Sequence, residues 1–302
     1  MVTGGARGLG LEIARVLVAK GANVAIVARD DFEIQRALEE LRRGCDANTT
    51  VIGVACDLLE PGAIETMLHA VRTIFGPIDV LVNNAGSIQV GPLDSMNVDD
   101  FEDAMKLHCF APLRTMLGVR DDMQSRGGGR IANIASIGGV VAVPHLMPYS
   151  ASKFALMGLS QGMRAELARD DILVSTIAPG LMRTGSPRRA FFKGNHEREY
   201  AWFAISDSLP LLSVSSGSAA RRIVRALEKG EPHVVIGLPA KLAALANGLA
   251  PGLVARALTV ANAALPAGDD PRARAGFESE SALVPSRLTR LSEQAAMRNN
   301  EL

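Results

Sequence analysis

The chain has 302 residues, of which 48% are apolar and 21% charged, and its 32 basic residues balance its 32 acidic ones. This balance argues against a nucleic-acid-binding surface, and the length suits one enzyme-sized domain with an appendage. The three cysteines form no C-x-x-C pair and the five histidines are scattered, so neither a disulfide framework nor a metal site is indicated. We therefore expect a protein of a reducing compartment, cytoplasmic and without a signal peptide.

Strand and helix patterns alternate along the chain, which is typical of a doubly wound parallel sheet with helices on both faces. Only Met1 and Val2 precede Thr3, so we expect a shortened central strand, and we favour a start codon assigned too late over a sheet that tolerates a short strand at its centre. The following pattern predicts strands at 23–28, 50–56, 79–82, 130–135, 173–177 and 233–236, and helices at 31–43, 61–75, 98–116 and 149–169. Ligands of such sheets bind beyond the carboxyl ends of the strands, and the candidate residues fall there.

A glycine-rich run, Thr-Gly-Gly-Ala-Arg-Gly-Leu-Gly, covers residues 3–10 and leads directly into an apolar helix pattern. Gly4, Gly8 and Gly10 lack side chains, so the turn can tighten and a pyrophosphate can approach the N–H groups at the helix N-terminus. A buried strand follows this helix, which is the context of a dinucleotide-binding loop.

The residue at the end of that strand indicates which dinucleotide is bound. No acidic residue precedes Arg29 there, whereas Arg29 and Arg7 supply guanidinium groups suited to a 2′-phosphate. The adjacent Asp30 offers an alternative, in which Arg29 is a neutralised surface residue. We favour NADP(H) over NAD(H).

A second group of residues is suited to proton transfer. Tyr149 and Lys153 are four residues apart, so a helix would place them on one face, and Ser136 lies upstream at a strand end. A tyrosine has an unperturbed pKa of about 10, and a nearby ammonium would lower it toward neutrality. The alternative is a half-buried tyrosine beside a solvated lysine.

In this order and spacing, these motifs resemble those of the short-chain dehydrogenase/reductase superfamily over residues 1–237. The resemblance rests on the glycine loop, Asp57, the run Asn-Asn-Ala-Gly at 83–86, Ser136, Tyr149 with Lys153, and the run from Pro179 to Thr184. It implies a Rossmann-like fold, a homodimer or homotetramer and small-molecule carbonyl chemistry without nucleic acid.

The resemblance also implies the role of each residue. Tyr149 would be the general acid or base, Lys153 would lower its pKa and hold the nicotinamide ribose, and Ser136 would orient the substrate carbonyl. Asp57 would contact the adenine. The implied cofactor site comprises Thr3, Gly4, Arg7, Gly8, Leu9, Gly10, Arg29, Asp57, Asn83, Ala85, Gly86, Tyr149, Lys153, Pro179, Gly180 and Thr184.

One position departs from the pattern of the superfamily. His108 aligns where many members carry an asparagine that supports a proton relay. A histidine could hold the relay water, but its charge near pH 6.5 would oppose Lys153. Packing alone is an equally good interpretation.

We divide the chain into a catalytic domain at 1–238, an apolar helical extension at 239–265 and a polar tail at 266–302. Within the domain, 181–216 is the expected substrate lid, and its aromatic residues indicate either an apolar pocket or a packed helix. We expect the extension to form two short helices, with a peripheral membrane contact as the alternative. The tail is expected to be disordered, with one weak helix at 286–298.

The sequence therefore predicts an NADP(H)-dependent oxidoreductase acting on a carbonyl or secondary alcohol of a moderately apolar substrate. Two alternatives stay open. The first is a 3-oxoacyl-thioester reductase, and the second is a non-catalytic NADP(H)-binding sensor or scaffold.

Overall fold

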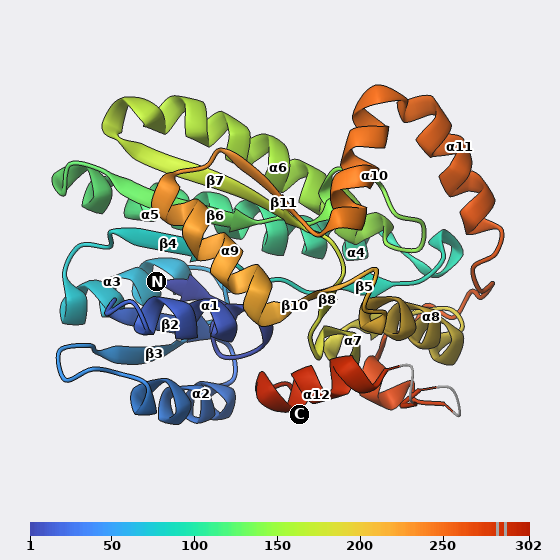
Figure 1. The fold of residues 1–302 in the computed structure, drawn as a ribbon, viewed down its shortest axis with the longest axis horizontal. Helices are drawn as coiled ribbons and strands as arrows, with labels where there is room; N and C mark the ends of the chain where they lie inside the picture. The colour runs from blue at the N-terminus through green and yellow to red at the C-terminus, as the bar shows by residue number, and fades with distance from the viewer. Residues whose placement is uncertain (282–283, 287–288) are drawn as a thin grey trace.

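A computed structural model describes residues 1–281, 284–286 and 289–302. At its centre lies a seven-stranded parallel sheet with the order β11-β7-β6-β4-β1-β2-β3 (Figure 1). The strands are β1 (Val2–Thr3), β2 (Val24–Ala28), β3 (Val51–Ala55), β4 (Val80–Asn83), β6 (Gly129–Ile134), β7 (Ile172–Pro179) and β11 (His233–Ile236). The strand order reverses between β1 and β4, and this switch point is where open α/β sheets bind ligands.

Helices cover both faces of the sheet, as the alternating pattern predicts. The helices α1 (Gly8–Val18), α2 (Asp31–Arg43) and α9 (Ser216–Lys229) pack on one face. The other face is covered by α3 (Ala63–Phe75), α5 (Ala111–Ser125) and α6 (Met147–Leu167). Strand β2 shows why both faces are apolar, because Val24 and Ile26 enter the first core while Ala25 and Val27 enter the second.

The first strand is two residues long, yet it is paired on both sides. Val2 pairs with Ile26 of β2 and with Val82 of β4. The amino group of Met1 donates to the Val80 carbonyl over 2.8 Å and extends the contact with β4.

The central helix is longer than the predicted 98–116. It runs as α4 (Val98–Met105), a π-helical turn (Lys106–Phe110) and α5, and the chain breaks only at Gly127, whose φ is +76°. Gly118 lies inside α5, where a Cβ would lie 2.4 Å from Leu68 Cδ1. This glycine serves close packing of α5 on α3 instead of a turn.

Beyond the sheet, the chain builds a lid and an extension. The lid contains β8 (Met182–Arg183), α7 (Ser186–Arg189), β9 (Phe191–Phe192), α8 (His196–Ser208) and β10 (Val214–Ser215). Strand β9 also pairs with β5 (Gln89–Val90) and β12 (Arg274–Ala275). The extension folds as α10 (Leu238–Leu249) and α11 (Pro251–Asn262), which stand away from the sheet at the upper right of Figure 1. In the part of the chain that the structure describes, no helix is both long and apolar enough to cross a bilayer.

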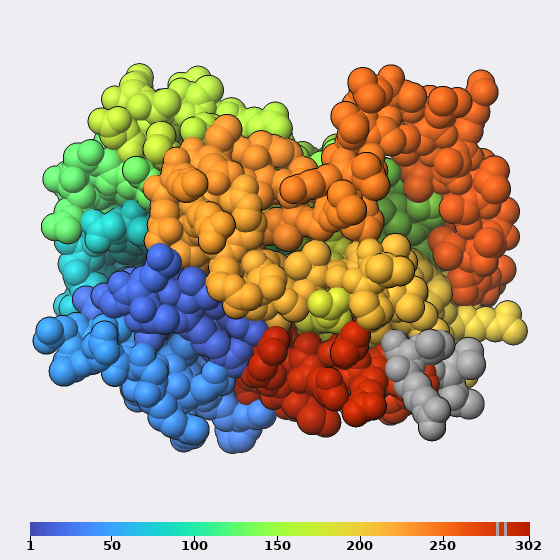
Figure 2. Space-filling model, viewed as in Figure 1, coloured from blue at the N-terminus to red at the C-terminus, as the bar shows by residue number. Residues whose placement is uncertain are grey.

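The polar tail is ordered in its described residues, where disorder was expected, and the one helix predicted in it, at 286–298, is present. Helix α12 (Arg290–Arg298) packs against α8, and Asn299, Asn300 and Glu301 are buried. Figure 2 shows this red segment filling the space between the blue N-terminal region and the yellow lid. Composition alone predicted disorder because the tail has few apolar residues, but its order comes from polar contacts with distant parts of the chain.

A line of buried polar side chains joins the strands beneath the candidate site. Asn83 accepts from Thr115 Oγ1 over 2.7 Å and donates to Asn133 Oδ1 over 2.9 Å. Asn133 in turn donates to Ser160 Oγ, which accepts from Thr176 Oγ1. Every link in this line is satisfied, which makes it a stabilising connection across β4, β6 and β7.

We predict that Asn133→Ala lowers the free energy of unfolding by about 2–4 kcal/mol, because the buried Asn83 Nδ2 loses its acceptor and Ser160 Oγ loses one of its donors. Urea denaturation of the wild type and the variant measures this loss. Asn48→Ala, at an exposed position, is the control and should stay within about 0.5 kcal/mol of the wild type. Equal losses in the two variants would show that the buried line contributes nothing specific.

Candidate active site

The glycine loop depends on close backbone contacts. Gly4 and Gly8 have φ values of +62° and +56°, a region that favours glycine. A Cβ on Gly10 would lie 2.0 Å from the Gly4 carbonyl oxygen, so only glycine allows the helix to start this close to the loop. The run 3–10 therefore leads into the N-terminus of α1 as its spacing predicted.

Thr3 and Asn84 hold this loop against the end of β4. Thr3 Oγ1 accepts from the N–H groups of Asn84 and Ala85 over 3.0 and 3.1 Å. The Asn84 side chain donates to the carbonyls of Thr3 and Gly4, each over 3.1 Å. Thr3 thus acts through the backbone of the loop. Sequence reasoning gave Asn84 no role, although it is a polar residue directly after a strand within the quoted motif.

A cavity of about 1130 Å³ extends along the carboxyl ends of the strands. Of the predicted site residues, it is lined by Gly4, Arg7, Gly8, Leu9, Arg29, Asp57, Ala85, Gly86, His108 and Tyr149. The other predicted residues do not line it, and these are Thr3, Gly10, Asn83, Ser136, Lys153, Pro179, Gly180 and Thr184. The glycine loop and Tyr149 therefore share one cavity. Thr3 and Lys153 do not line it but contact the lining residues Ala85 and Tyr149.

Arginines line the end of this cavity near β2. Arg29 lies 4.0 Å from Asp57, whereas Asp30 is occupied as the cap of α2 and accepts from Glu33 N. The acid that faces Arg29 is therefore Asp57 and not Asp30, and the interpretation of Arg29 as a neutralised surface residue stays an alternative. The Arg29 side chain is 68% exposed, so its guanidinium is free to turn toward a ligand.

Tyr149 and Lys153 lie on the first turns of α6, as their spacing predicted. Lys153 Nζ is 5.6 Å from the centre of the Tyr149 ring and donates to the Ile134 carbonyl over 2.9 Å. Ser136 follows β6, and its Oγ accepts from Gly138 N over 3.0 Å. These contacts fix all three side chains at the carboxyl ends of the strands.

Burial controls the ionisation of this group. Burial raises the pKa of Tyr149 to about 12, although a hydrogen bond from the Ser136 side chain acts to lower it. Burial also lowers the pKa of Lys153 to about 7. The expected lowering of the tyrosine pKa by the ammonium is thus not found, because desolvation has the larger effect. Tyr149 is a protonated phenol at neutral pH.

His108 lies in the π-helical turn, and its ring is edge-on to Tyr149 with 5.5 Å between ring centres. Its Nε2 accepts from Ser87 N over 3.1 Å, so Nδ1 carries the proton and donates to Ser152 Oγ over 2.8 Å. Burial, together with the charge of Lys153, lowers the pKa of His108 well below its usual value. His108 is therefore neutral and does not oppose Lys153. Because both ring nitrogens are engaged, neither is left to hold a relay water.

The lid aromatics form a core of their own. Phe192, Tyr200 and Phe203 are buried together, and Phe192 contacts the other two rings edge-on. Phe191, which is 41% exposed, lines the cavity. Both interpretations of the aromatic cluster hold in part, since most rings pack within the lid and Phe191 faces the ligand space.

The lid also brings two buried acids to the site that sequence reasoning missed. Glu199 accepts from the Trp202 indole over 2.7 Å and lies 2.8 Å from Nδ1 of His145, which lies just before the start of α6. Asp207 is buried near Tyr149, and burial raises the pKa of Asp207 to about 8, with a further contribution from Glu301. Neither acid belongs to a spacing pattern, so the sequence carried no signal for them.

Comparison with known proteins identifies the family of the chain. A family model described as short chain dehydrogenase matches residues 1–191, so the chain belongs to the short-chain dehydrogenase/reductase family. It is 38% identical over 186 residues to a putative ketoacyl reductase of Streptomyces coelicolor, covering 61% of this chain and 70% of that protein. It is 31% identical over 264 residues to dehydrogenase/reductase SDR family member 7B of Bos taurus, covering 85% and 78%.

Solved structures give the same result. Actinorhodin polyketide ketoreductase with NADPH superposes with a TM-score of 0.68 at 31% identity, covering 78% of this chain and 94% of that one. L-sorbose reductase of Gluconobacter frateurii, complexed with NADPH and L-sorbose, gives 0.70 at 25% identity, covering 78% and 93%. The chain is thus an oxidoreductase of a family that binds a nicotinamide cofactor and acts on small molecules.

We predict a pH-dependent stability difference between the wild type and Asp207→Asn. The pKa of Asp207 rises from 3.8 to about 8 on folding, so the folded state holds more protons between these values. Its contribution to the free energy of unfolding therefore falls as pH rises from 4 to 8, on the order of a few kcal/mol.

The amide variant lacks this titration, so its stability relative to the wild type should increase across the window. Urea denaturation at pH 4.5, 6 and 8 measures the difference. A difference that stays constant with pH would show that Asp207 keeps an ordinary pKa.

Proposed function

We propose that the protein is an NADP(H)-dependent reductase of a ketone or aldehyde on a moderately apolar substrate. The observation that carries the proposal is the position of Tyr149, which shares a cavity with the glycine loop and has Ser136 and Lys153 beside it. The fold alone does not define carbonyl reduction, whereas the phenol of Tyr149, a proton donor in the cavity, supports it.

The residues of the cavity fit a dinucleotide. The N–H groups at the start of α1 and the side chain of Arg7 would hold the pyrophosphate. Asp57 would lie at the adenine and Arg29 at the 2′-phosphate, since these two side chains meet beside β2. Tyr149 and Lys153 would hold the nicotinamide ribose at the other end. When bound, the nicotinamide supplies the hydride.

The protonation state of Tyr149 favours reduction. A carbonyl that accepts hydride develops negative charge on oxygen, and a neutral phenol can donate the proton that this oxygen requires. The raised pKa of Tyr149 keeps that proton in place at neutral pH. The Ser136 hydroxyl would donate to the same oxygen and hold it toward the phenol. In its ammonium form, Lys153 would contact the ribose and would favour loss of the phenolic proton during the reaction.

A 3-oxoacyl thioester is the second candidate substrate. Two putative ketoacyl reductases, one of Streptomyces coelicolor and one of the granaticin polyketide synthase of Streptomyces violaceoruber, are 38% and 36% identical to this chain over the matched residues. Phe191, Ile88 and Leu107 line the cavity and would suit an acyl chain. Including acyl thioesters in the substrate panel tests this candidate directly.

We predict that Tyr149→Phe lowers turnover by at least about 100-fold, because the ring stays but the proton donor is lost. NADPH oxidation with a panel of ketones, aldehydes and acyl thioesters measures turnover. NADPH should still bind, with an affinity lowered far less than turnover because only one contact to the ribose is lost, and this separates a catalytic role from misfolding.

Tyr200→Phe is the matched control, since Tyr200 is the other tyrosine of the chain and packs on Phe192. It should keep wild-type turnover. Equal activity of the wild type and Tyr149→Phe would overturn the assigned chemistry. NADPH binding without turnover across the panel would instead support a sensor or scaffold.

We predict that Arg29→Ala raises the Kd for NADPH about tenfold or more and leaves the Kd for NADH unchanged, because only NADPH carries the 2′-phosphate. Fluorescence titration with both cofactors measures the ratio. Arg126→Ala removes an exposed arginine that pairs with Asp79 far from the cavity and should alter neither Kd. A parallel loss of NADH affinity in Arg29→Ala would remove the assignment to the 2′-phosphate.

A further inference from the structure

Residues 299–302, here called the latch, lie on the glycine loop. The Gly8 N–H donates to the Asn299 carbonyl over 2.8 Å. The Asn300 side chain donates to the carbonyls of Ala6 and Glu33 over 2.8 and 2.9 Å. The latch therefore contacts the loop through both backbone and side chain, from a position almost the whole chain away in sequence.

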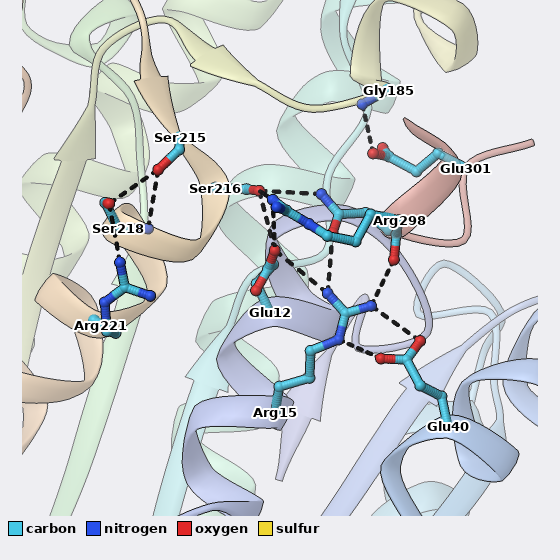
Figure 3. Close-up of polar contacts among 11 residues, drawn as sticks. Glu12, Arg15, Glu40, Gly185, Ser215, Ser216, Ser218, Arg221, Arg298 and Glu301 are labelled. Carbon is cyan, nitrogen blue, oxygen red and sulfur yellow. Dashed lines mark hydrogen bonds and ion pairs between the residues drawn. The ribbon is translucent and has the colours of Figure 1, made fainter. Parts of the chain in front are cut away.

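The Glu301 carboxylate occupies the position where a phosphate of the cofactor would be bound. One of its oxygens accepts from Gly185 N over 2.5 Å (Figure 3). The other would lie 3.0 Å from a Cβ on Gly8. Arg7 and Arg189 are close enough for their charges to favour the carboxylate. Burial nonetheless raises the pKa of Glu301 to about 7. An acid that accepts from a backbone N–H and lies beside a helix N-terminus and two arginines has surroundings like those of a bound phosphate.

Side chains outside the cofactor cavity fix the latch from the other side. Arg15 donates to Asn299 Oδ1 over 3.0 Å, to the Arg298 carbonyl over 2.6 Å and to Glu40 over 2.9 Å. Arg298 lies 3.1 Å from Glu12, as Figure 3 shows. Arg15 does not line the cavity that contains the glycine loop and Tyr149. Substitution of Arg15 can therefore weaken the attachment of the latch without removing a residue that lines the cofactor cavity.

Two features show that the bound latch is not an optimal arrangement. Asn300 has a φ of +57°, which is unusual for a residue other than glycine. Its Oδ1 is buried and has no hydrogen-bond partner in the described part of the chain, which costs free energy. A segment with these costs can leave its site when a better ligand arrives.

We propose that the latch is a built-in competitor of the cofactor, which closes the pyrophosphate part of the site and must withdraw before the dinucleotide binds. The two cannot be bound together, because the Gly8 N–H is already engaged and the Glu301 carboxylate would face the pyrophosphate at close range. The apparent affinity for the cofactor is then the intrinsic affinity multiplied by the fraction of molecules with an open latch. This inference rests on the proposed cofactor-dependent function.

Two variants weaken the latch from opposite sides and test the inference by NADPH titration. The double variant Asn300→Ala/Glu301→Ala removes three hydrogen bonds of the latch, and Arg15→Ala removes its outer support. Both should lower the Kd for NADPH, by about tenfold for the double variant. Glu228→Gln, a charge removed from an exposed pair on α9, is the control and should leave the Kd unchanged.

Hydrogen exchange of the unmodified chain provides a readout that depends on no substitution. The N–H groups of Asn299 and Glu301 donate to Ala295 and Ala296 carbonyls, and saturating NADPH should increase their exchange. The N–H of Gly8 should stay protected, because a phosphate replaces the Asn299 carbonyl. Increased protection of the latch with NADPH would overturn the inference, since the latch would then close over the cofactor.

The outcomes separate the two proposals. Unchanged or weaker NADPH binding in both latch variants, with a wild type that binds NADPH, would overturn the latch alone. Failure of the wild type and of both variants to bind NADPH or NADH would overturn the proposed function and the latch with it.

Discussion

The contact between Gly10 and the Gly4 carbonyl is the constraint on which the rest of the structure depends. A Cβ at residue 10 would lie 2.0 Å from that oxygen, so the loop can close on α1 only through glycine. This closeness aims the first N–H groups of α1 into the cavity beside the strand switch point. Thr3 and Asn84 then hold the loop against β4. Everything proposed about the cofactor, and about the latch that imitates it, requires these N–H groups to be exposed to a ligand.

Burial determines the ionisation state of several groups in the site. It keeps the phenol of Tyr149 protonated, lowers the pKa of Lys153 and holds His108 neutral. A protonated donor beside a cofactor site is suited to carbonyl reduction. The same desolvation acts on Asp207 and Glu301, so bringing a ligand and its charges into the cavity would change several ionisation states together.

Periodic features of the sequence predicted the fold well. The helix at 31–43 and the strand at 233–236 were predicted at their observed bounds, because a helix cap and a short apolar run mark them. The helix predicted at 98–116 continues through Gly118, whose role depends on Leu68, a contact that only the fold creates. The positions of Tyr149 and Lys153 followed from their spacing on one helix. The pKa of Tyr149 could not be predicted from the sequence, because it depends on which groups surround the ring.

The tail and the polar partners escaped prediction for a related reason. Asn84 and Ser152 act through hydrogen bonds and Asp207 through burial, and no repeating pattern marks such residues. Residues 299–301 looked disordered because they are polar, yet their partners are Gly8, Arg15 and Gly185. Contacts between segments so far apart in sequence leave no local signal. They are visible only when the sheet and the lid bring both segments together.

A crystal structure of the protein grown with NADPH tests the central claim most directly. The account predicts one dinucleotide in the cavity, with its 2′-phosphate at Arg29, its pyrophosphate at the Gly8 N–H and its nicotinamide beside Tyr149, and with residues 299–302 displaced from the glycine loop. A structure in which those residues stay on Gly8 while NADPH binds elsewhere would contradict it.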